Sequence, residues 1–532
     1  MMPSSIFNDV IGPVMRGPSS SHCAASLRIG RMCLDLMGGA IMDVLIEYDP
    51  NGSLATTHKS QGSDMGLFGG FLGWEADDPR LENYQAEISA AGIYPVIEIK
   101  DIGADHPNTY QINLKNGELA HQLIALSIGG GMIEVISIDG AKVNMTGGYF
   151  ENLIFTANTA PVVALLKTLD HYDDLQGHEG EKSFVNLKCQ SALSEAILNE
   201  LNAIEGVEEI RCLRPVLPVK SRKNLSVPFS TCEEMLAYNE DKDLELWELA
   251  VAYESARGNI SSEQVYEQMK GIVAIMSDSI KSGLKGTEYK DRILGYQSGN
   301  FKTQMEQGKL VAGDSLNRII LFVTAMMEVK SSMGVIVAAP TAGSCGALPG
   351  AILGVCSALD LGEEAAVKAM LAAGIIGVFI SERATFAAEV GGCQAECGSG
   401  SGMAAAGIVG MMGGSLHQAL AASSMALQNS LGMICDPVAN RVEAPCLGRN
   451  VMAASNALST ANMALADYDH LVPLDQVIEA MDEVGHAMAH ELRCTGLGGL
   501  SISKASREIE AKLAAMSGEE PLTSAAQKFK FC

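Results

Sequence analysis

The sequence predicts a multidomain protein with an N-terminal α+β domain, a small βαββαβ unit and a C-terminal all-α domain. A chain of 532 residues is too long for one hydrophobic core, so about two to four domains are expected. Aromatic residues make up only 5% of the chain, whereas glycine and methionine are abundant, and such small or flexible side chains suit closely packed helices. From Leu244 to Leu513 the apolar residues recur at helical spacing, with Leu246, Leu249 and Tyr253 on one face.

The first domain, residues 1–150, mixes short apolar runs with turn signals. Strands are predicted at residues 44–48, 94–99 and 132–138, and a short glycine-rich helix at residues 65–72. The first strand ends at Asp49-Pro50-Asn51-Gly52, a sequence typical of a tight turn. Because strands and a helix occur together, an α+β domain is expected.

The second unit, residues 151–219, alternates strands with helices. Strands are predicted at residues 152–156, 184–188 and 209–213, and helices at residues 161–169 and 194–204, with a polar run at residues 170–182. This order resembles an ACT domain, an amino-acid-sensing βαββαβ module, although Asn158-Thr159-Ala160-Pro161 replaces the glycine-bearing turn of that family. We expect either an effector-binding unit or a purely structural one. Residues 220–240 are expected to be a linker, residues 241–520 the helical domain and residues 521–532 a C-terminal tail.

The composition excludes several classes of partner. A net charge of −26 argues against nucleic acid and against anionic membrane surfaces. The first nine residues have neither the basic nor the apolar region of a signal peptide. The uncharged stretches at residues 331–359 and 397–435 contain polar side chains throughout, which favours buried helices over membrane spans. Thirteen cysteines without framework spacing fit a reducing cytosol, so a cytoplasmic protein is expected.

Three cysteines in the last third of the chain, Cys393, Cys435 and Cys446, each lie in a turn marked by glycine or proline. Three thiolates are one fewer than the four that close an ordinary iron–sulfur site, and a cluster held in this way keeps one iron open for substrate. The spacing contains no CxxC pair, so these residues could also be buried hydrophobic side chains. The neighbouring Cys397 is an alternative ligand to Cys393.

Polar motifs in the first domain suggest a second set of functional residues. Gly17-Pro18-Ser19-Ser20-Ser21-His22 can form a polar turn or helix cap, or its hydroxyls and imidazole can hold a carboxylate. His58-Lys59-Ser60-Gln61-Gly62-Ser63-Asp64 and His106-Pro107-Asn108-Thr109 follow in the sequence. Ser127-Ile128-Gly129-Gly130-Gly131 offers backbone N–H groups in a glycine turn, a candidate anion nest.

A glycine turn in the helical domain, Thr341-Ala342-Gly343-Ser344-Cys345-Gly346, resembles a phosphate-binding loop but lacks a Walker lysine. It could seat pyridoxal phosphate, yet no lysine stands in a motif typical of a Schiff-base anchor. Glu389 and Glu396 flank Cys393 and can either solvate helix ends or orient ligands.

These motifs, in order along nearly the whole chain, resemble the iron–sulfur-dependent L-serine dehydratases (L-serine ammonia-lyases) with β and α domains fused in one chain. The resemblance implies that Cys393, Cys435 and Cys446 hold a [4Fe–4S] cluster. It implies catalytic roles for His22, His58 and His106, although Lys59-Ser60-Gln61 departs from the HGTD-like residues usual after the second histidine. The substrate-binding residues implied by the resemblance are Ser19, Ser20, Ser21, Asn108, Ser127, Gly129, Gly130, Thr341 and Gly343. The active site would then form between the two domains.

The expected activity is the conversion of L-serine to pyruvate and ammonia, in which the open iron serves as a Lewis acid and a base removes the α-proton. A histidine is the natural candidate for that base near neutral pH. L-Threonine and L-cysteine are alternative substrates. A pyridoxal-phosphate lyase and a non-catalytic amino-acid sensor with structural zinc are the alternative classes. A homodimer is expected.

Cys532 follows Lys528-Phe529-Lys530-Phe531 at the end of the sequence. One expectation is a frayed tail. The other is a regulatory tail, because a terminal cysteine carries a carboxylate beside a thiol and so imitates a free amino acid. In some members of the family that the chain resembles, a terminal cysteine folds into the active site.

Overall fold

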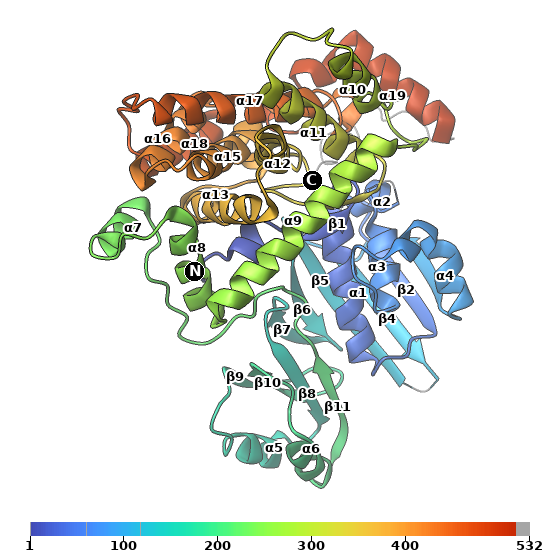
Figure 1. Cartoon of the computed structure of the whole chain (residues 1–532). Helices are drawn as coiled ribbons and strands as arrows, with labels where there is room; N and C mark the ends of the chain where they lie inside the picture. The colour runs from blue at the N-terminus through green and yellow to red at the C-terminus, as the bar shows by residue number, and fades with distance from the viewer. Residues whose placement is uncertain (1, 60, 118, 518–532) are drawn as a thin grey trace. The chain divides into compact units, whose positions relative to one another are not determined.

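The computed structural model describes residues 2–59, 61–117 and 119–517. The chain forms two compact units. One consists of Ser19–Leu225 and holds two β-sheets, and the other joins residues 1–18 to the largely helical chain from Ser226 onward (Figure 1). An N-terminal α/β region followed by a C-terminal helical region was the architecture expected from the sequence.

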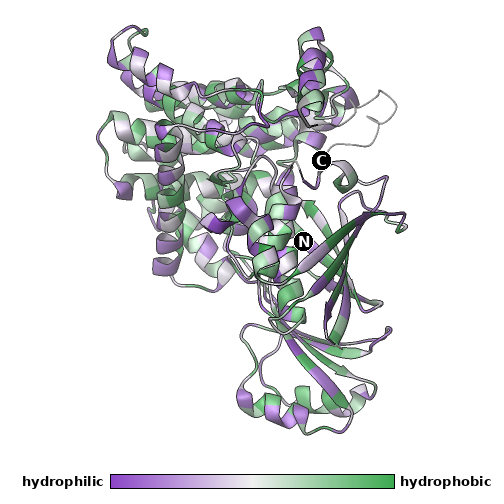
Figure 2. Ribbon diagram, turned by 90° about the vertical axis from the view of Figure 1, so that its right-hand side faces the viewer, coloured by the Kyte–Doolittle hydropathy of each residue, from purple (hydrophilic) through white to green (hydrophobic). Residues whose placement is uncertain are grey.

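The larger sheet of the first unit has six strands in the order β3-β2-β4-β5-β6-β7. Their bounds are Asp43–Tyr48 (β2), Tyr94–Ile99 (β3), Thr109–Asn116 (β4), Leu119–Gly129 (β5), Met132–Ile138 (β6) and Ala141–Met145 (β7). β2 and β3 are parallel and the other pairs are antiparallel, so the sheet is mixed. Buried and more exposed residues alternate along β4 and β5, and Figure 2 shows both hydrophobic and hydrophilic residues on the strands. In β4 this period of two buries Tyr110, Ile112 and Leu114 on the core side.

Helices α1 (Ala25–Leu36), α2 (Leu54–Thr57), α3 (Ser63–Phe71) and α4 (Tyr84–Ala90) complete this part of the unit. α1 and α3 pack closely, because glycines stand where their backbones meet. A Cβ atom placed on Gly30 of α1 would lie 2.9 Å from the Cα atom of Gly70 in α3. The glycine-rich helix that the sequence predicts is α3. Because its glycines have no side chains, its backbone can approach the backbone of α1 closely.

The smaller sheet has the βαββαβ element order expected from the sequence. Its elements are β8 (Phe150–Thr156), α5 (Thr159–Leu166), β9 (Asp174–His178), β10 (Phe184–Cys189), α6 (Glu195–Asn202) and β11 (Val207–Leu213). The strands pair antiparallel in the order β11-β8-β10-β9. The polar run at residues 170–182 supplies β9, which tolerates polar residues because it is an edge strand. Kinship with amino-acid-sensing modules stays a prediction.

The second unit is built almost wholly from helices. These are α7 (Cys232–Asn239), α8 (Leu246–Gly258), α9 (Ser262–Lys285), α10 (Ser298–Glu306), α11 (Asp314–Ser331), α12 (Ala347–Ala358), α13 (Glu363–Arg383), α14 (Ala388–Gly391), α15 (Ser399–Met411), α16 (Leu416–Gln428), α17 (Cys446–Leu465), α18 (Leu474–Ala487) and α19 (Lys504–Ser517). α7 lies within residues 220–240, the stretch expected to be a linker. The first residues of the chain join this unit because β1 (Val14–Arg16) pairs antiparallel with β12 (Val335–Val337).

Helix α15 is at the centre of the helical unit, where it packs against α12, α13, α16 and α17. Its sequence consists mainly of glycine, alanine and serine, and residues 399–409 are buried. Small side chains allow four neighbours to approach one helix. Within the described residues, α13 is the one helix long and apolar enough to cross a membrane, and 78% of its most apolar stretch is buried inside the protein, as in the core helix of a globular domain.

Candidate metal centre

The three cysteines singled out in the sequence come from three separate segments of the helical unit. Cys393 follows α14 and immediately precedes a π-helical turn, Gln394–Gly398. Cys435 lies after α16, where its backbone N–H donates to Leu492 and forms a short bridge with Arg493. Cys446 is the first residue of α17. All three are buried, so bringing them together is a consequence of the tertiary fold.

The thiols of Cys393 and Cys435 lie close together, with the carboxylate of Glu396 beside them. The two sulfur atoms and one carboxylate oxygen of Glu396 are all within 4.8 Å of one another, a spacing that can hold a metal ion. Cys393 also hydrogen-bonds to Cys397. Burial raises the pKa of the Cys446 thiol, and the nearby charge of Cys393 raises it further. Cys393 and Cys435 thus meet directly, together with Glu396, and Cys446 lies within electrostatic reach of Cys393.

Two further cysteines belong to this cluster. Cys397 is fully buried in the π-helical turn, and Cys494 lies against Cys393 and Cys435. Cys494 hydrogen-bonds to Cys435 through its thiol and donates its backbone N–H to the carbonyl of Cys435 at 2.9 Å. Sequence patterns could not identify Cys494, because it lies 59 residues after Cys435 in a segment without a recognisable motif.

Hydrogen bonds to Cys397 and Cys435 lower the pKa of the Cys393 thiol, and a positive charge assists them. The guanidinium of Arg449 donates to the Cys393 sulfur at 3.4 Å and to Asp436 at 2.5 Å. The Cys435 thiol is in the opposite situation, since its hydrogen bonds to Cys393 and Cys494 raise its pKa. Cys393 is thus the thiol of this cluster that the surroundings favour as a thiolate.

Asn450 fixes the glycine turn that begins at Thr341 against the start of α17. Its amide NH₂ donates to the carbonyls of Gly343 at 2.9 Å and Cys446 at 2.8 Å, while its amide oxygen accepts from the backbone of Gly346 and Ala347. A fully buried amide with these partners holds the turn in a fixed place beside Cys446.

The same turn meets Glu396. Thr341 donates its hydroxyl hydrogen to the Glu396 carboxylate at 2.5 Å. Burial first, and then the charges of Cys393 and Glu389, hold the pKa of Glu396 well above its usual range. A Cβ atom on Gly343 would lie 2.8 Å from a Glu396 oxygen, so a larger residue there must displace that carboxylate. Thr341 and Gly343, both predicted site residues, therefore border the cysteine cluster.

The serine–histidine motif and the segment after Cys393 adopt the same local structure. The serine–histidine motif forms a π-helical turn, Ser20–Ala24, that leads into α1, just as Gln394–Gly398 leads into α15. Single π-helical turns are rare and are frequent at functional sites. A third π-helical turn, Ile6–Val10, carries no predicted site residue, so this local structure alone does not identify the functional motifs.

The histidine motifs of the first unit are joined by hydrogen bonds. The ring of His22 is buried between the hydroxyls of Ser19 at 2.8 Å and Thr57 at 2.9 Å. Thr57 in turn donates to the carbonyl of Ser53, whose hydroxyl bonds to Asn108. Burial, assisted by the charge of His58, lowers the pKa of His22 to about 4, so its ring is neutral at pH 7.

The other two histidines have different partners. His58 Nδ1 lies 2.7 Å from a carboxylate oxygen of Asp64, which is buried. His106 is partly exposed, and its Nδ1 accepts the backbone N–H of Asn108 at 3.1 Å. Burial lowers the pKa of His106. His58 is therefore oriented by a carboxylate and His106 by a backbone amide, two settings that suit different chemical roles.

The remaining predicted residues of the first unit lie near this network or in a turn. Ser20 is buried, and Ser21 accepts a 2.7 Å hydrogen bond at its carbonyl from the buried Ser127. Gly129 and Gly130 form the tight hairpin turn between β5 and β6 with positive φ angles, which by itself requires glycine. Anion binding by this turn stays a prediction. Cys532 lies outside the described residues.

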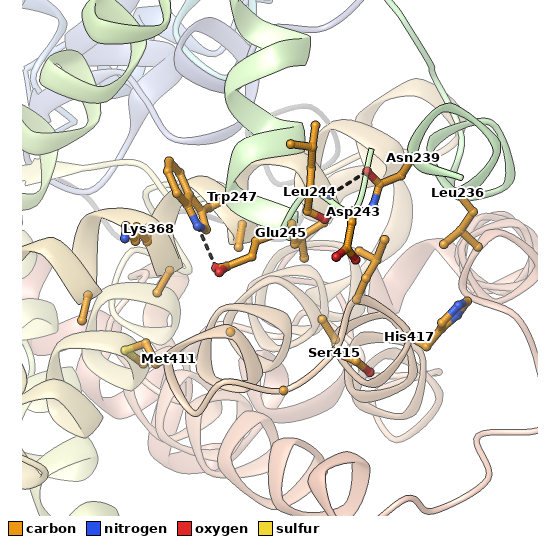
Figure 3. Close-up of a pocket in the computed structure, with 18 of the residues that line it drawn as sticks. Leu236, Asn239, Asp243, Leu244, Glu245, Trp247, Lys368, Met411, Ser415 and His417 are labelled. Atoms are coloured by element: carbon orange, nitrogen blue, oxygen red, sulfur yellow. Dashed lines mark hydrogen bonds between the residues drawn. The ribbon is translucent and has the colours of Figure 1, made fainter. Parts of the chain in front are cut away.

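A large cavity lies elsewhere in the helical unit. It measures about 820 Å³ and is lined by Asp243, Glu245 and Trp247 on one side and by Ser415 and His417 on the other (Figure 3). It adjoins Met411 at the far end of α15, about 20 Å along the helix from Cys397 at 1.5 Å per residue. None of the residues that line this cavity belongs to a predicted motif. The volume of a cavity therefore does not by itself identify the functional site of this protein.

The helical unit thus gathers buried thiols, a carboxylate and a guanidinium in one place, a set of groups that could hold a metal ion. The family model described as "Serine dehydratase alpha chain" matches residues 241–501, which span this site. "Probable L-serine dehydratase, alpha chain" of Bacillus subtilis is 36% identical over 285 residues, covering 54% of this chain and 95% of the relative. The chain therefore belongs to the serine dehydratase family, whose members are lyases.

Relatives with a single long chain extend the similarity to both units. "L-serine dehydratase" of Helicobacter pylori is 27% identical over 495 residues, which cover 91% of this chain and 96% of the relative. "L-serine dehydratase 1" of Escherichia coli is 26% identical over 515 residues, with 91% and 96% covered. The order of the two units in this chain is thus shared with these relatives.

Proposed function

We propose that this chain converts L-serine to pyruvate and ammonia with a [4Fe–4S] cluster held by Cys393, Cys435 and Cys446. The observation that carries the proposal is one buried site in which the thiols of Cys393 and Cys435 and an oxygen of Glu396 lie within 4.8 Å of one another, with the Cys446 thiol within electrostatic reach of Cys393. The names of the relatives supply the substrate, since they are L-serine dehydratases.

The donor set fits an iron–sulfur cluster. Thiolate sulfur is the ligand such clusters use, and burial shields the site from water. The guanidinium of Arg449 at the Cys393 sulfur offsets part of the negative charge that several thiolates bring together. When bound, a cluster with one iron lacking a protein ligand supplies a Lewis acid that makes the substrate hydroxyl a viable leaving group.

The residues around the cysteines would receive the rest of the amino acid. Thr341 and the backbone of the glycine turn border the site, held in place by Asn450. The Glu396 carboxylate, with its raised pKa, is placed to exchange a proton with a group bound next to Cys393. Binding and proton exchange by these side chains are the steps that we assign to this chain's own atoms.

Among the histidines, we assign removal of the α-proton to His58. Because Asp64 holds Nδ1, the Nε2 atom is the basic nitrogen of the neutral ring. His106 has the opposite tautomer, since Nδ1 accepts a backbone N–H and Nε2 then carries the proton, which suits donation to a carboxylate. His22, neutral and held by two hydroxyls, would orient the serine-rich turn.

Anaerobic reconstitution tests the proposal. Protein loaded with ferrous iron and sulfide should bind four irons, show the broad visible absorbance of thiolate-bound clusters and release pyruvate from L-serine, with L-threonine and L-cysteine assayed alongside. Prolonged aeration with a chelator should abolish the activity, and ferrous iron with a thiol should restore it. Tightly bound zinc in place of iron, a lysine adduct trapped by borohydride, or activity that survives aeration and chelation would each contradict the cluster mechanism.

A further inference from the structure

Arg449 makes contacts with all three segments that carry the proposed ligands. Its side chain starts on α17, three residues after Cys446. One guanidinium nitrogen donates to the sulfur of Cys393 at 3.4 Å, and another donates to the carboxylate of Asp436 at 2.5 Å. Asp436 directly follows Cys435 in the sequence. One side chain therefore connects the Cys446 helix, the Cys393 turn and the Cys435 segment.

Asp436 is itself held in place. Its side chain is 3% exposed, and its second carboxylate oxygen accepts the backbone N–H of Leu500 at 2.7 Å. A carboxylate with both oxygens occupied cannot turn away from its partner. The Arg449 side chain is 15% exposed, so this ion pair lies largely away from water, where charge-assisted hydrogen bonds are strongest.

This arrangement differs from the other arginine–carboxylate pairs of the helical unit. Arg383, for example, lies between Asp475 and Glu479 and bridges α13 to α18. Its side chain is 27% exposed, and the partners of its guanidinium are these two carboxylates. Arg449 instead gives one of its donors to a sulfur atom. A guanidinium directed at a cysteine that is proposed to bind metal has a role beyond joining two helices.

We propose that Arg449, held by Asp436, is the positioning residue of this metal centre. It sets the three cysteine-bearing segments at fixed separations and gives the Cys393 sulfur a hydrogen bond and a nearby positive charge. This inference rests on the proposed function, because it concerns the residues proposed to hold the cluster. Hydrogen bonds to ligand sulfurs and local charge are factors that set the reduction potential of iron–sulfur clusters. Arg449 therefore influences both how firmly iron is kept and how easily the cluster accepts an electron.

Substitution separates these two effects. In Arg449→Ala both contacts are lost, and cluster retention against a chelator should weaken about 10–100-fold, the usual cost of removing a partner of a metal ligand. The reduction potential should become more negative, because the reduced cluster loses a stabilising positive charge. Arg449→Lys should recover part of the potential but little of the retention, since an ammonium cannot bridge two acceptors as a planar guanidinium does. Asp436→Asn should lie between these variants and the wild type.

The experiment compares anaerobically reconstituted full-length proteins. Iron per chain, loss of visible absorbance in chelator and potentiometric titration are measured for wild type, Arg449→Ala, Arg449→Lys, Asp436→Asn and the control Arg383→Ala. The control removes an arginine–carboxylate pair that has no hydrogen bond to any of the proposed ligands, and it should match the wild type. Circular dichroism of the metal-free proteins identifies a folding defect, in which case the Arg449→Lys and Asp436→Asn comparison decides the question.

The outcomes distinguish this inference from the proposal on which it rests. If the wild type loads four irons and the Arg449 variants keep them equally well at an unchanged potential, the inference is wrong and the proposed function stands. If the wild type binds no iron under these conditions, the proposed function is wrong, and the inference falls with it.

Discussion

Thr341 and Glu396 share a short hydrogen bond, 2.5 Å from hydroxyl oxygen to carboxylate oxygen, although 55 residues separate them in the chain. The contact joins the glycine turn to the π-helical turn that carries Cys397. The glycine turn and the Glu396 carboxylate, which were noted separately in the sequence, thus lie side by side next to the cysteine cluster.

This contact predicts the effect of Gly343→Ala. The added methyl group would lie 2.8 Å from a Glu396 oxygen, closer than carbon and oxygen normally approach, so the carboxylate must move away from Thr341. We expect turnover of L-serine to fall at least tenfold, with the melting temperature little changed. The matched control is Gly271→Ala on α9, where a Cβ atom meets nothing within 4 Å. Wild-type kinetics in Gly343→Ala would show that Glu396 has no part in the reaction.

Alanine substitution of the cysteines tests the ligand set. Cys393→Ala, Cys435→Ala and Cys446→Ala should each lose both the visible absorbance and the activity, because two thiolates do not hold a four-iron cluster. Cys356→Ala is the control, since that buried cysteine of α12 lies in the same unit outside the cluster. Iron analysis of Cys397→Ala and Cys494→Ala completes the series. If Cys393→Ala kept its iron while Cys397→Ala lost it, the assignment of ligands would have to be exchanged.

The depressed pKa of His22 predicts how stability depends on pH. Its pKa is about 4 in the folded protein and about 6.5 when unfolded, so between these values the unfolded state binds more protons. The contribution of His22 to stability is therefore complete above pH 6.5 and is lost as the pH falls to 4. It amounts to roughly 3 kcal/mol at 1.36 kcal/mol per pKa unit. Urea unfolding of wild type and His22→Gln should converge as the pH is lowered, and a difference that does not vary with pH would contradict this assignment.

The tautomers inferred for His58 and His106 predict separable kinetic defects. His58→Asn removes the proposed base, so turnover should fall by about 10²–10⁴-fold, the usual contribution of a general base. His106→Asn should mainly raise the KM for L-serine, because it removes a donor to the carboxylate. Iron content should equal that of the wild type in both variants, which shows that neither residue holds the cluster. A larger fall in turnover for His106→Asn than for His58→Asn would reverse the two roles.

The strands at residues 94–99 and 132–138 appear at the positions predicted from sequence. A short run rich in β-branched residues is a local property, and both strands have it. The strand β9 could not be predicted in this way, because an edge strand with polar side chains has no apolar period to detect. The pairing of β1 with β12 could not be predicted from the sequence either, since the two strands are more than 300 residues apart.

The sequence by itself determined the order of the units, the helical character of the chain beyond Leu244 and the candidate ligands Cys393, Cys435 and Cys446. These follow from composition, periodicity and motifs, all of which are read from neighbouring residues. Only the tertiary structure decided that Cys494 joins the cluster and that Arg449 reaches the sulfur of Cys393, 56 residues away. Such contacts depend on how helices such as α15 and α17 pack, because packing brings together side chains that no local pattern relates.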